Sequence, residues 1–348
     1  MTSGANADSM MTVALDVMSG DDSPRSRIRA AVRALDRFNS LHLQLVGDQP
    51  LIEDYLSDME CTDRSRISLI HANKTVTMHD KPSLALRGKK DSSMWKVLEL
   101  VAKNEAQACV SAGNTGALMA MGRYVLKTFA GIDRPAIAAS VPTSTGSALL
   151  MDMGANVDCT SMHLYQFAIM GAQLASSVYG VESPRVGLLN IGTEEMKGNE
   201  QVRLAHHLLQ EKLGAQQGLE YIGFIEGHDI FSGSADVIVC DGFVGNVALK
   251  TGEGVASLIR DGLKSIFQRS LLNRFLYFLI SPLLREFNRK IDPVLHNGAS
   301  LLGLQGIVIK SHGGADEKGF YRAICQAVKE AEYEVPVRIA REVEERLL

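Results

Sequence analysis

The amino-acid sequence predicts an α/β fold built on a mainly parallel β-sheet, with a helical appendage late in the chain. Short apolar, β-branched runs recur along the chain, and most of them end in a cluster of Gly, Asn, Asp, Ser or Thr that precedes a longer helical pattern. The length of 348 residues fits roughly two domains, or one large α/β unit with an appendage. With 46% hydrophobic and 22% charged residues, the composition is that of an ordinary folded protein.

The expected strands share an apolar core of four to seven residues. They are residues 12–15, 43–46, 67–71, 108–111, 149–153, 185–191, 237–240 and 306–310. A helical pattern follows most of them, which is typical of βα units. Residues 1–10 are expected to be a disordered tail, and residues 11–348 the α/β domain.

Residues 255–290 break this pattern, because no strand intervenes and apolar residues recur there at helical spacing. Basic residues punctuate the segment, among them Arg260, Lys264, Arg269, Arg274 and Arg285. We therefore expect two helices that meet near residues 269–273 and project from the sheet as an amphipathic hairpin.

The charge balance excludes several classes of protein. With 36 basic and 40 acidic residues the net charge is -4, so no global positive field exists to hold nucleic acid, and any basic docking site must be local. The five cysteines lack CxxC spacing, which argues against structural zinc and a disulfide framework and favours a reducing cytoplasm. We expect no metal, no cofactor, no secretory signal and no membrane-spanning helix.

Ligands of open α/β sheets bind beyond the carboxyl ends of the strands, so the polar clusters there are the candidate sites. The first is Ser111 to Ala117, where Gly113 and Gly116 permit close backbone approach and Asn114 or Thr115 can cap a helix whose free N–H groups would face a phosphate. A tight turn with a good cap explains the same residues about equally well.

Two further loops contain single polar groups that could stabilise an oxyanion. Lys197 lies in a glycine-bounded loop with Thr193, Glu194 and Glu195, and a solvated turn in which Lys197 pairs with a glutamate is the alternative. Asn246 follows Asp241 at a helix start, where its amide could donate to an anion or could simply cap the helix.

The remaining candidates are His312, at the end of the last expected strand, and Asp16, at the end of the first. Each could orient a ligand or serve only the local structure. The chain has no GxSxG nucleophile elbow, no HExxH motif and no nucleotide-binding fingerprint. The candidate residues include many groups that can donate to an anion and few nucleophiles. We therefore expect a substrate to supply the nucleophile, and inorganic phosphate is a nucleophile that these loops could hold.

These clusters, in this order, resemble the bacterial phosphate acyltransferases of phospholipid synthesis, which make acyl phosphate from acyl-acyl carrier protein and phosphate. The shared strings begin with DVMSGDDSP at Asp16 and extend through SAGNTGALMA, MDMGANVD, SPRVGLLNIGTEEMKGNE and DVIVCDGFVGNVALKT to VIKSHGGAD. They cover nearly everything after Met10. A single shared string would be weak support for membership of this family, whereas a series of them in the same order is specific to it.

The resemblance implies a homodimeric three-layer α/β/α sandwich, similar to phosphotransacetylases and isopropylmalate dehydrogenases. It implies that Lys197 and Asn246 are the active-site residues, and that the enzyme is cytoplasmic and peripherally associated with the inner face of the membrane. Its acyl phosphate would feed glycerol-3-phosphate acylation, in contact with the membrane acyltransferase. Membrane contact would fall on the hairpin, for which the candidates are Phe275, Leu276, Phe278 and Leu279. A buried helical core or a dimer contact is the alternative for these four residues.

Two loops depart from the family pattern. The first loop of the family usually reads GGDH, whereas this chain has Ser19, Gly20, Asp21 and Asp22, so a histidine role there is lost. The late loop usually contains two serines where this chain has Gly313, Gly314 and Ala315, which puts hydroxyl contacts from it in doubt.

The resulting hypothesis is direct acyl transfer to phosphate, with Lys197 and Asn246 stabilising the oxyanion and the remaining loop residues holding phosphate or substrate. Those residues are Asp16, Ser111, Gly113, Asn114, Thr115, Gly116, Thr193, Asp241 and His312. The partner, acyl carrier protein, is acidic, and Arg87, Lys89 and Lys90 are the candidate dock. The alternatives are a phosphotransacetylase that uses coenzyme A thioesters, a metal-dependent dehydrogenase of related fold, and a membrane-surface binding protein without activity.

Overall fold

A mixed β-sheet organises the chain in the computed structural model, which describes residues 10–61, 63–213, 218–291 and 297–347. Its strands are β1 (Met11–Asp16), β2 (Leu41–Gly47), β3 (Ile67–His71), β4 (Ala108–Ser111), β5 (Ala136–Thr143), β6 (Gly146–Met151), β7 (Arg185–Leu189), β8 (Glu220–Ile225), β9 (Val237–Val239), β10 (Ala299–Leu302) and β11 (Ile307–Lys310). Their spatial order is β3-β2-β1-β4-β11-β10-β5-β6-β9-β7-β8.

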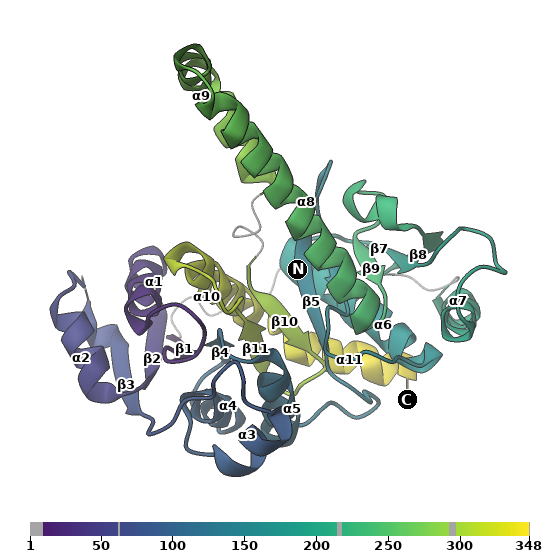
Figure 1. Ribbon diagram of the computed structural model, residues 1–348. Helices are drawn as coiled ribbons and strands as arrows, with labels where there is room; N and C mark the ends of the chain where they lie inside the picture. Colours follow the sequence, from purple (N-terminus) through teal and green to yellow (C-terminus); the bar gives the residue numbers. More distant parts are fainter. Residues whose placement is uncertain (1–9, 62, 214–217, 292–296, 348) are drawn as a thin grey trace.

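The helices connect these strands and cover both faces of the sheet (Figure 1). They are α1 (Pro24–Arg37), α2 (Gln49–Ser57), α3 (Pro82–Gly88), α4 (Ser93–Ala102), α5 (Thr115–Leu126), α6 (Ser161–Tyr179), α7 (Glu200–Leu213), α8 (Gly242–Gln268), α9 (Leu271–Ile291), α10 (Glu317–Glu332) and α11 (Val335–Leu347). Two short 3₁₀ turns, Arg64–Arg66 and Gly227–Phe231, complete the described elements.

Strand direction divides the sheet into two halves. β3, β2, β1, β4 and β11 run parallel to one another. β6, β9, β7 and β8 are also mutually parallel. Between the halves, β10 pairs antiparallel with β11 and β5, and β5 pairs antiparallel with β6, so the two halves point in opposite directions. The carboxyl ends of the strands therefore lie at two edges of the sheet, where sequence reasoning expected one.

Apolar clusters fill both sides of each half of the sheet. In the first half, α1 and α10 pack on one face and α4 and α5 on the other. In the second half, α6 and α11 cover one face, and the start of α8 packs on the other through Ala248 and Leu249. This arrangement is the three-layer α/β/α sandwich that the sequence predicted.

The eight expected strands are present, with ends shifted by up to a few residues, whereas β5, β8 and β10 were missed. The sequences of β5 and β10 are rich in Ala and Ser, and each joins the next strand by a turn without a helix. The βα pattern therefore gave no signal for these antiparallel strands.

The helical hairpin is also present, as two helices that meet at Arg269. Its first helix begins much earlier than expected, at Gly242, because α8 is the same helix that follows β9. The rings of Phe267 and Tyr277 lie 5.3 Å apart and hold the two helices together. Figure 1 shows α8 and α9 projecting together from the sandwich. None of the described helices has an apolar stretch long enough to span a lipid bilayer.

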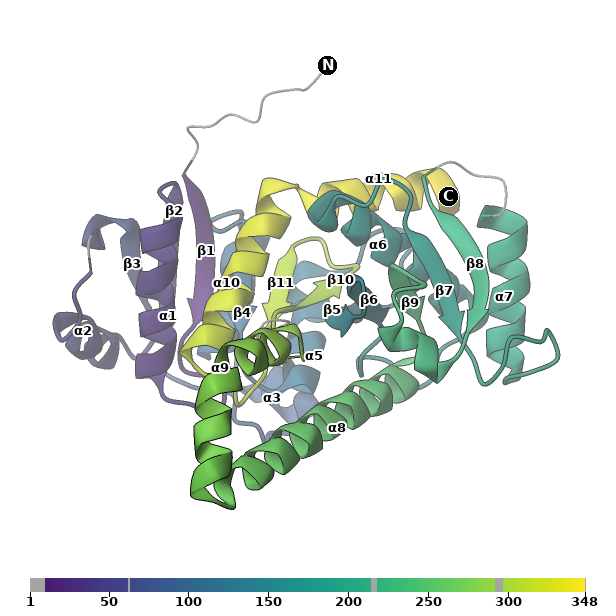
Figure 2. The same ribbon diagram turned by 90° about the horizontal axis from the view of Figure 1, so that it is seen from above.

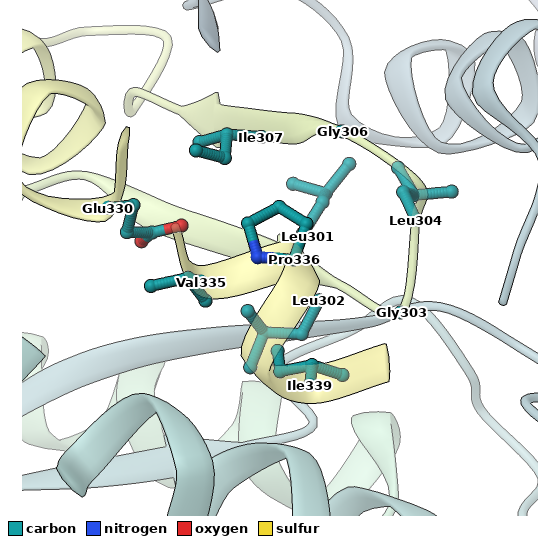
Figure 3. Close-up of a pocket in the computed structure, with 10 residues that line it drawn as sticks. All are labelled: Leu301, Leu302, Gly303, Leu304, Gly306, Ile307, Glu330, Val335, Pro336 and Ile339. Atoms are coloured by element: carbon teal, nitrogen blue, oxygen red, sulfur yellow. The ribbon is translucent and has the colours of Figure 1, made fainter. Parts of the chain in front are cut away.

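A buried carboxyl group lies in the core beside α11. Glu330 lines a cavity of about 10 Å³ formed by β10, β11 and the start of α11 (Figure 3), which is no larger than a single water molecule needs. Its carboxylate accepts a hydrogen bond from Ser300 and one of 2.8 Å from Gln326. Burial nevertheless raises the pKa of Glu330 to about 7. This cavity is too small to be an active site.

Glu330 should make stability depend on pH. Between about pH 4.5 and 7 the native carboxyl keeps a proton that the unfolded chain has lost, so the free energy of unfolding falls as pH rises through this window. The effect of this group is up to about 3 kcal/mol. We expect Glu330→Gln to lose less stability than the wild type between about pH 5 and pH 8 in urea unfolding. Glu332→Gln, exposed on the same helix, is the control; equal pH slopes in all three proteins would contradict the assignment.

Candidate active site

The first group of candidate residues lies where β1, β4 and β11 end. Asp16 is fully buried, and its carboxylate accepts the Ser111 hydroxyl at 2.7 Å and the backbone N–H of Ser19 at 3.2 Å. The Ser111 hydroxyl in turn accepts the N–H of Gly113 at 3.2 Å. The N–H of Ser311 donates to the Ser111 carbonyl at 2.9 Å. Hydrogen bonds therefore join three predicted residues, Asp16, Ser111 and Gly113, to the loop after β11.

Asn114 holds the turn into α5. Its Oδ1 accepts the N–H of Ala117 at 3.0 Å, and its Nδ2 donates to the carbonyl of Met78 at 2.8 Å. Both ends of the amide are thus engaged in structure. The N–H groups of Thr115 and Gly116 precede the first intrahelical bond of α5, so they are the donors that this loop can offer to an anion.

Two buried cations, which sequence reasoning did not single out, lie behind these loops. Lys310, the last residue of β11, donates from Nζ to the carbonyl of Ala112 at 3.4 Å. Burial lowers the pKa of Lys310 to about 8, although nearby Asp21 favours its charged form. Arg27, on α1, is 1% exposed, and its Nε and Nη2 have no hydrogen-bond partner among the described residues. Burial lowers its pKa as well, against the opposing effect of Asp16.

His312 lies exposed just beyond Lys310. Its backbone N–H donates to Oδ1 of Asn297 at 2.9 Å, and its Nδ1 accepts the N–H of Gly314 at 3.2 Å. Partial burial and the positive charges of Lys250 and Lys310 lower the pKa of His312, so its imidazole is neutral at pH 7. A neutral ring can accept a proton or a hydrogen bond from a phosphate hydroxyl.

The second group of candidate residues surrounds Asp152, which follows β6. The Asp152 carboxylate is fully buried and accepts the backbone N–H groups of Ile137 at 3.0 Å, Ala155 at 3.2 Å and Asn156 at 2.7 Å. Burial still raises its pKa. The start of α8 packs directly on this loop, because a Cβ on Gly245 would lie only 1.9 Å from the Asp152 carbonyl oxygen.

Asn246 is the first exposed polar residue after this contact. Asp241 caps α8 by accepting the N–H of Val244 at 2.8 Å, so Asn246 lies inside the helix and is not its cap. Its Nδ2 lies 2.9 Å from the point where a Cβ on Gly154 would stand. Gly154 has a φ of +119°. The Asn246 amide is therefore positioned by a glycine that leaves it room.

Lys197 lies in the loop after β7. Asn190 shapes this loop by donating from Nδ2 to the carbonyls of Gly192 at 3.0 Å and Lys197 at 3.2 Å. The Lys197 side chain is 46% exposed, and its Nζ lies 3.9 Å from a carboxylate oxygen of Glu194. The predicted pairing with a glutamate is thus present, at a distance that leaves the ammonium able to meet an anion. Thr193 is exposed beside it.

The loop that contains Lys197 and the start of α8, which contains Asn246, belong to the same edge of the sheet, because they follow the parallel neighbours β7 and β9. The loops that contain Asp16, Ser111 and His312 belong to the other half. Helix α8 joins the two groups: Asn246 is in its second turn, and Lys250 and Glu253 one turn later are near enough to His312 to act on its pKa. Figure 2 shows α8 running from the β7–β9 side to α9, and Figure 1 shows it rising away from the sandwich along this path.

The residues predicted as a dock lie at the end of α3 and have partners of their own. Lys89 forms an ion pair of 2.6 Å with Asp80, and the pKa of Asp80 is lowered mainly by that hydrogen bond. The ammonium of Lys90 lies 5.6 Å from the ring centroid of Trp95. Arg87 is in the last turn of α3.

Some residues that sequence reasoning missed left a signal in the sequence. Lys310 is a charged residue at the end of an apolar strand, and Arg27 occupies a position of α1 that the helical period assigns to the buried face, next to Ile28 and Ala31. Asp152 left the same kind of signal, because it directly follows the apolar end of β6, but its contact with α8 is visible only in the structure. Within the described residues, no group of three or more His, Cys, Asp or Glu side chains is arranged to hold a metal ion.

Comparison with known proteins gives a consistent assignment. A family model described as "Fatty acid synthesis protein" matches residues 11–338. A phosphate acyltransferase of Pseudomonas syringae pv. syringae is 53% identical over 332 residues, which cover 95% of this chain and 96% of that protein. The phosphate acyltransferase of Methylococcus capsulatus is 54% identical over 330 residues, covering 95% and 96%.

Solved structures share the fold at much lower sequence identity. A phosphotransacetylase from Streptococcus pyogenes superposes with a TM-score of 0.62 at 16% identity, covering 92% of this chain and 94% of that one. A branched-chain phosphotransacylase from Enterococcus faecalis gives a TM-score of 0.57 at 14% identity, covering 92% and 99%. At such identities the likeness supports the fold alone.

Proposed function

The chain belongs to the fatty acid synthesis protein family and is a phosphate acyltransferase, and we propose that it transfers an acyl group from acyl carrier protein to inorganic phosphate. The observation that supports this assignment most directly is a pair of exposed donors that follow neighbouring parallel strands, Lys197 in the loop after β7 and Asn246 in α8 after β9. The product, an acyl phosphate, would supply acylation of glycerol 3-phosphate in phospholipid synthesis.

The proposed reaction is a direct displacement. A phosphate oxygen forms a bond to the thioester carbonyl carbon, the carbon–sulfur bond breaks, and the departing thiolate takes up a proton. Lys197 and Asn246 donate to the carbonyl oxygen as it gains negative charge. The N–H groups of Thr115 and Gly116 and the imidazole of His312 hold the phosphate, with Lys310 supplying positive charge behind them.

The cysteines near the candidate site do not favour an acyl-enzyme. Cys240 is fully buried with its thiol 3.7 Å from the Asp152 carbonyl, and burial raises its pKa well above the usual value. Burial also raises the pKa of Cys159 to about 12. Because the thiolate is the reactive form, both groups are unreactive at neutral pH. The nucleophile is then phosphate itself.

The assay that tests this function presents one long-chain acyl group in two forms, on acyl carrier protein and on coenzyme A, with inorganic phosphate. We expect acyl phosphate to form from the carrier-linked substrate. Product from coenzyme A alone would instead favour a phosphotransacetylase, and no product from either, with a folded protein, would favour a binding protein.

Lys197 and Asn246 can each be tested by removal of the side chain. Lys197→Ala and Asn246→Ala should each lower kcat about 100- to 1000-fold, because each removes a group that stabilises developing negative charge. The fold should be unchanged, since both side chains are exposed. Turnover, circular dichroism and thermal melting are the measurements. Full activity in either folded variant would remove that residue from the mechanism.

A further prediction tests how Asn246 is positioned. Gly154→Ala places a methyl group 2.9 Å from Nδ2 of Asn246 and should displace the amide, lowering kcat about 100-fold. Gly146→Ala is a matched control, because Gly146 also has a positive φ, of +154°, but open space around it. We expect both variants to lose some stability and only Gly154→Ala to lose turnover; equal losses of kcat would mean that backbone strain alone is responsible.

We also propose that the α8–α9 hairpin contacts the inner face of the membrane and that the enzyme is a cytoplasmic homodimer. The four predicted contact residues are all exposed: Phe275 by 59%, Leu276 by 44%, Phe278 by 73% and Leu279 by 57%. Exposed apolar groups on a projecting helix are typical of an interfacial segment. The acyl phosphate would then be released close to a membrane acyltransferase that consumes it.

Replacing Leu276 and Phe278 with Asp should abolish binding to vesicles of phosphatidylglycerol and phosphatidylethanolamine in a flotation assay, because a charged group is costly to bury among acyl chains. Turnover with soluble substrate should persist. Val337→Asp on α11 alters another exposed apolar residue, of 56% exposure, and should leave vesicle binding intact. Undiminished flotation of the double variant would exclude this contact.

A further inference from the structure

A strongly basic surface extends along two neighbouring helices that the mechanism does not use. Helices α1 and α10 pack side by side on one face of the sheet (Figures 1 and 2). The α1–α10 basic surface consists of six exposed cationic residues, namely Arg29, Arg33, Arg37, Lys318, Arg322 and Lys329. The three arginines of α1 recur every four residues, so they form one stripe along the helix.

Within the described residues, these cations form no ion pairs, and some of them contact aromatic rings. None of the six forms an ion pair with a carboxylate in the described part of the chain. Three of them rest on aromatic rings instead. The Arg33 guanidinium lies 4.5 Å from the ring centroid of Tyr321, the Arg37 guanidinium 5.4 Å from that of Phe38, and the Lys329 ammonium 5.3 Å from that of Tyr179. In a chain of net charge -4, this is a local positive field.

A groove of about 480 Å³ extends from this surface to Asn297, beside the loop after β11. Arg37, Arg322 and Lys329 line it, and so does Asn297. Asn297 is the residue whose Oδ1 accepts the backbone N–H of His312 at 2.9 Å. A flexible substrate arm that follows this groove would therefore arrive at the loop after β11.

We propose that the α1–α10 basic surface is the docking site for the acidic acyl carrier protein, an inference that rests on the function proposed above. Complementary charge would steer the carrier to the surface, and the groove would guide its acyl-bearing arm toward His312. The surface binds through charge, because no large apolar side chain is exposed on α1 or α10.

The chemistry of this surface favours a protein over two other occupants. A membrane-inserting surface needs apolar groups beside its cations, and in the described residues these gather on the hairpin. A two-fold contact with a second copy would bring like charges together. The sequence-predicted dock at Arg87, Lys89 and Lys90 offers less free charge, since Lys89 is paired with Asp80.

The test is a charge reversal on each helix. The double variant Arg29→Glu, Arg322→Glu changes two exposed side chains for which the structure shows no hydrogen bond or ion pair. We expect its KM for long-chain acyl carrier protein to rise about 10-fold or more, and its kcat and KM for phosphate to stay unchanged. The rise should shrink as ionic strength increases.

Two further variants serve as controls. Arg338→Glu, Arg341→Glu makes the same change in net charge on exposed residues of α11, so it should leave the KM for the carrier substrate unaltered. Arg33→Gln, Lys318→Gln only neutralises the surface and should raise that KM by a smaller factor. Thermal melting monitors the fold of each variant.

The outcomes separate this proposal from the proposed function. If the wild type makes no acyl phosphate, the proposed function fails, and fluorescence anisotropy of labelled holo-acyl carrier protein then tests the docking site. Loss of carrier binding in Arg29→Glu, Arg322→Glu supports the docking site, whereas retained binding overturns it. An unchanged KM in this variant also overturns the proposal. A KM for the carrier substrate that rises only in Lys89→Glu, Lys90→Glu would also overturn it. So would a charge reversal on α1 and α10 that weakens binding to phosphatidylglycerol vesicles alone.

Discussion

The contact between the loop after β6 and the start of α8 determines the position of every polar group on that helix. Gly245 meets the Asp152 carbonyl, and Gly242 donates its N–H to the Asn156 carbonyl at 2.7 Å. No side chain could replace either glycine without moving the helix, since a Cβ on each would lie under 3.0 Å from its neighbour. Burying the Asp152 carboxylate is costly, and the N–H groups that converge on it offset that cost. The loop can therefore serve as a rigid base for α8.

Helix α8 extends from this base and links the two halves of the sheet. The two halves of the sheet point in opposite directions, so loops at their carboxyl ends begin at opposite edges. Strand twist of about 20° to 25° per strand rotates one half of the sheet relative to the other. The helix then spans the remaining gap, because Asn246 and Lys250 lie one turn apart on it and the charge of Lys250 acts on His312. A site made from both halves depends on the length and direction of this single helix.

The βα units, the hairpin and the polar segments that contain Lys197 and Asn246 could be predicted because each leaves a local pattern, whereas the sandwich followed from the family resemblance. The sequence could not predict the reversal of the sheet, which depends on three antiparallel pairings made between segments without a distinctive period. Of the two roles that the sequence allowed for Asn114, the structure shows the helix cap, with the amide used by Met78 and Ala117. Long-range packing decides whether a polar side chain faces a ligand or the protein, and one sequence contains no record of that packing.

Positive charge in this protein takes two physical forms, which suit different tasks. Lys310 and Arg27 are buried, where a charge acts strongly over short distances but must be balanced, here by Asp16 and Asp21. A phosphate approaching these loops also meets the carboxylates, and protonation of Lys310 offsets part of their repulsion. The arginines on α1 are exposed and screened, so each acts weakly on its own, and their effect depends on number and spacing. A small anion such as phosphate can interact with the buried charges, whereas an acidic protein surface requires the exposed ones. With both kinds of charge, a chain of net negative charge can attract a small anion and an acidic protein.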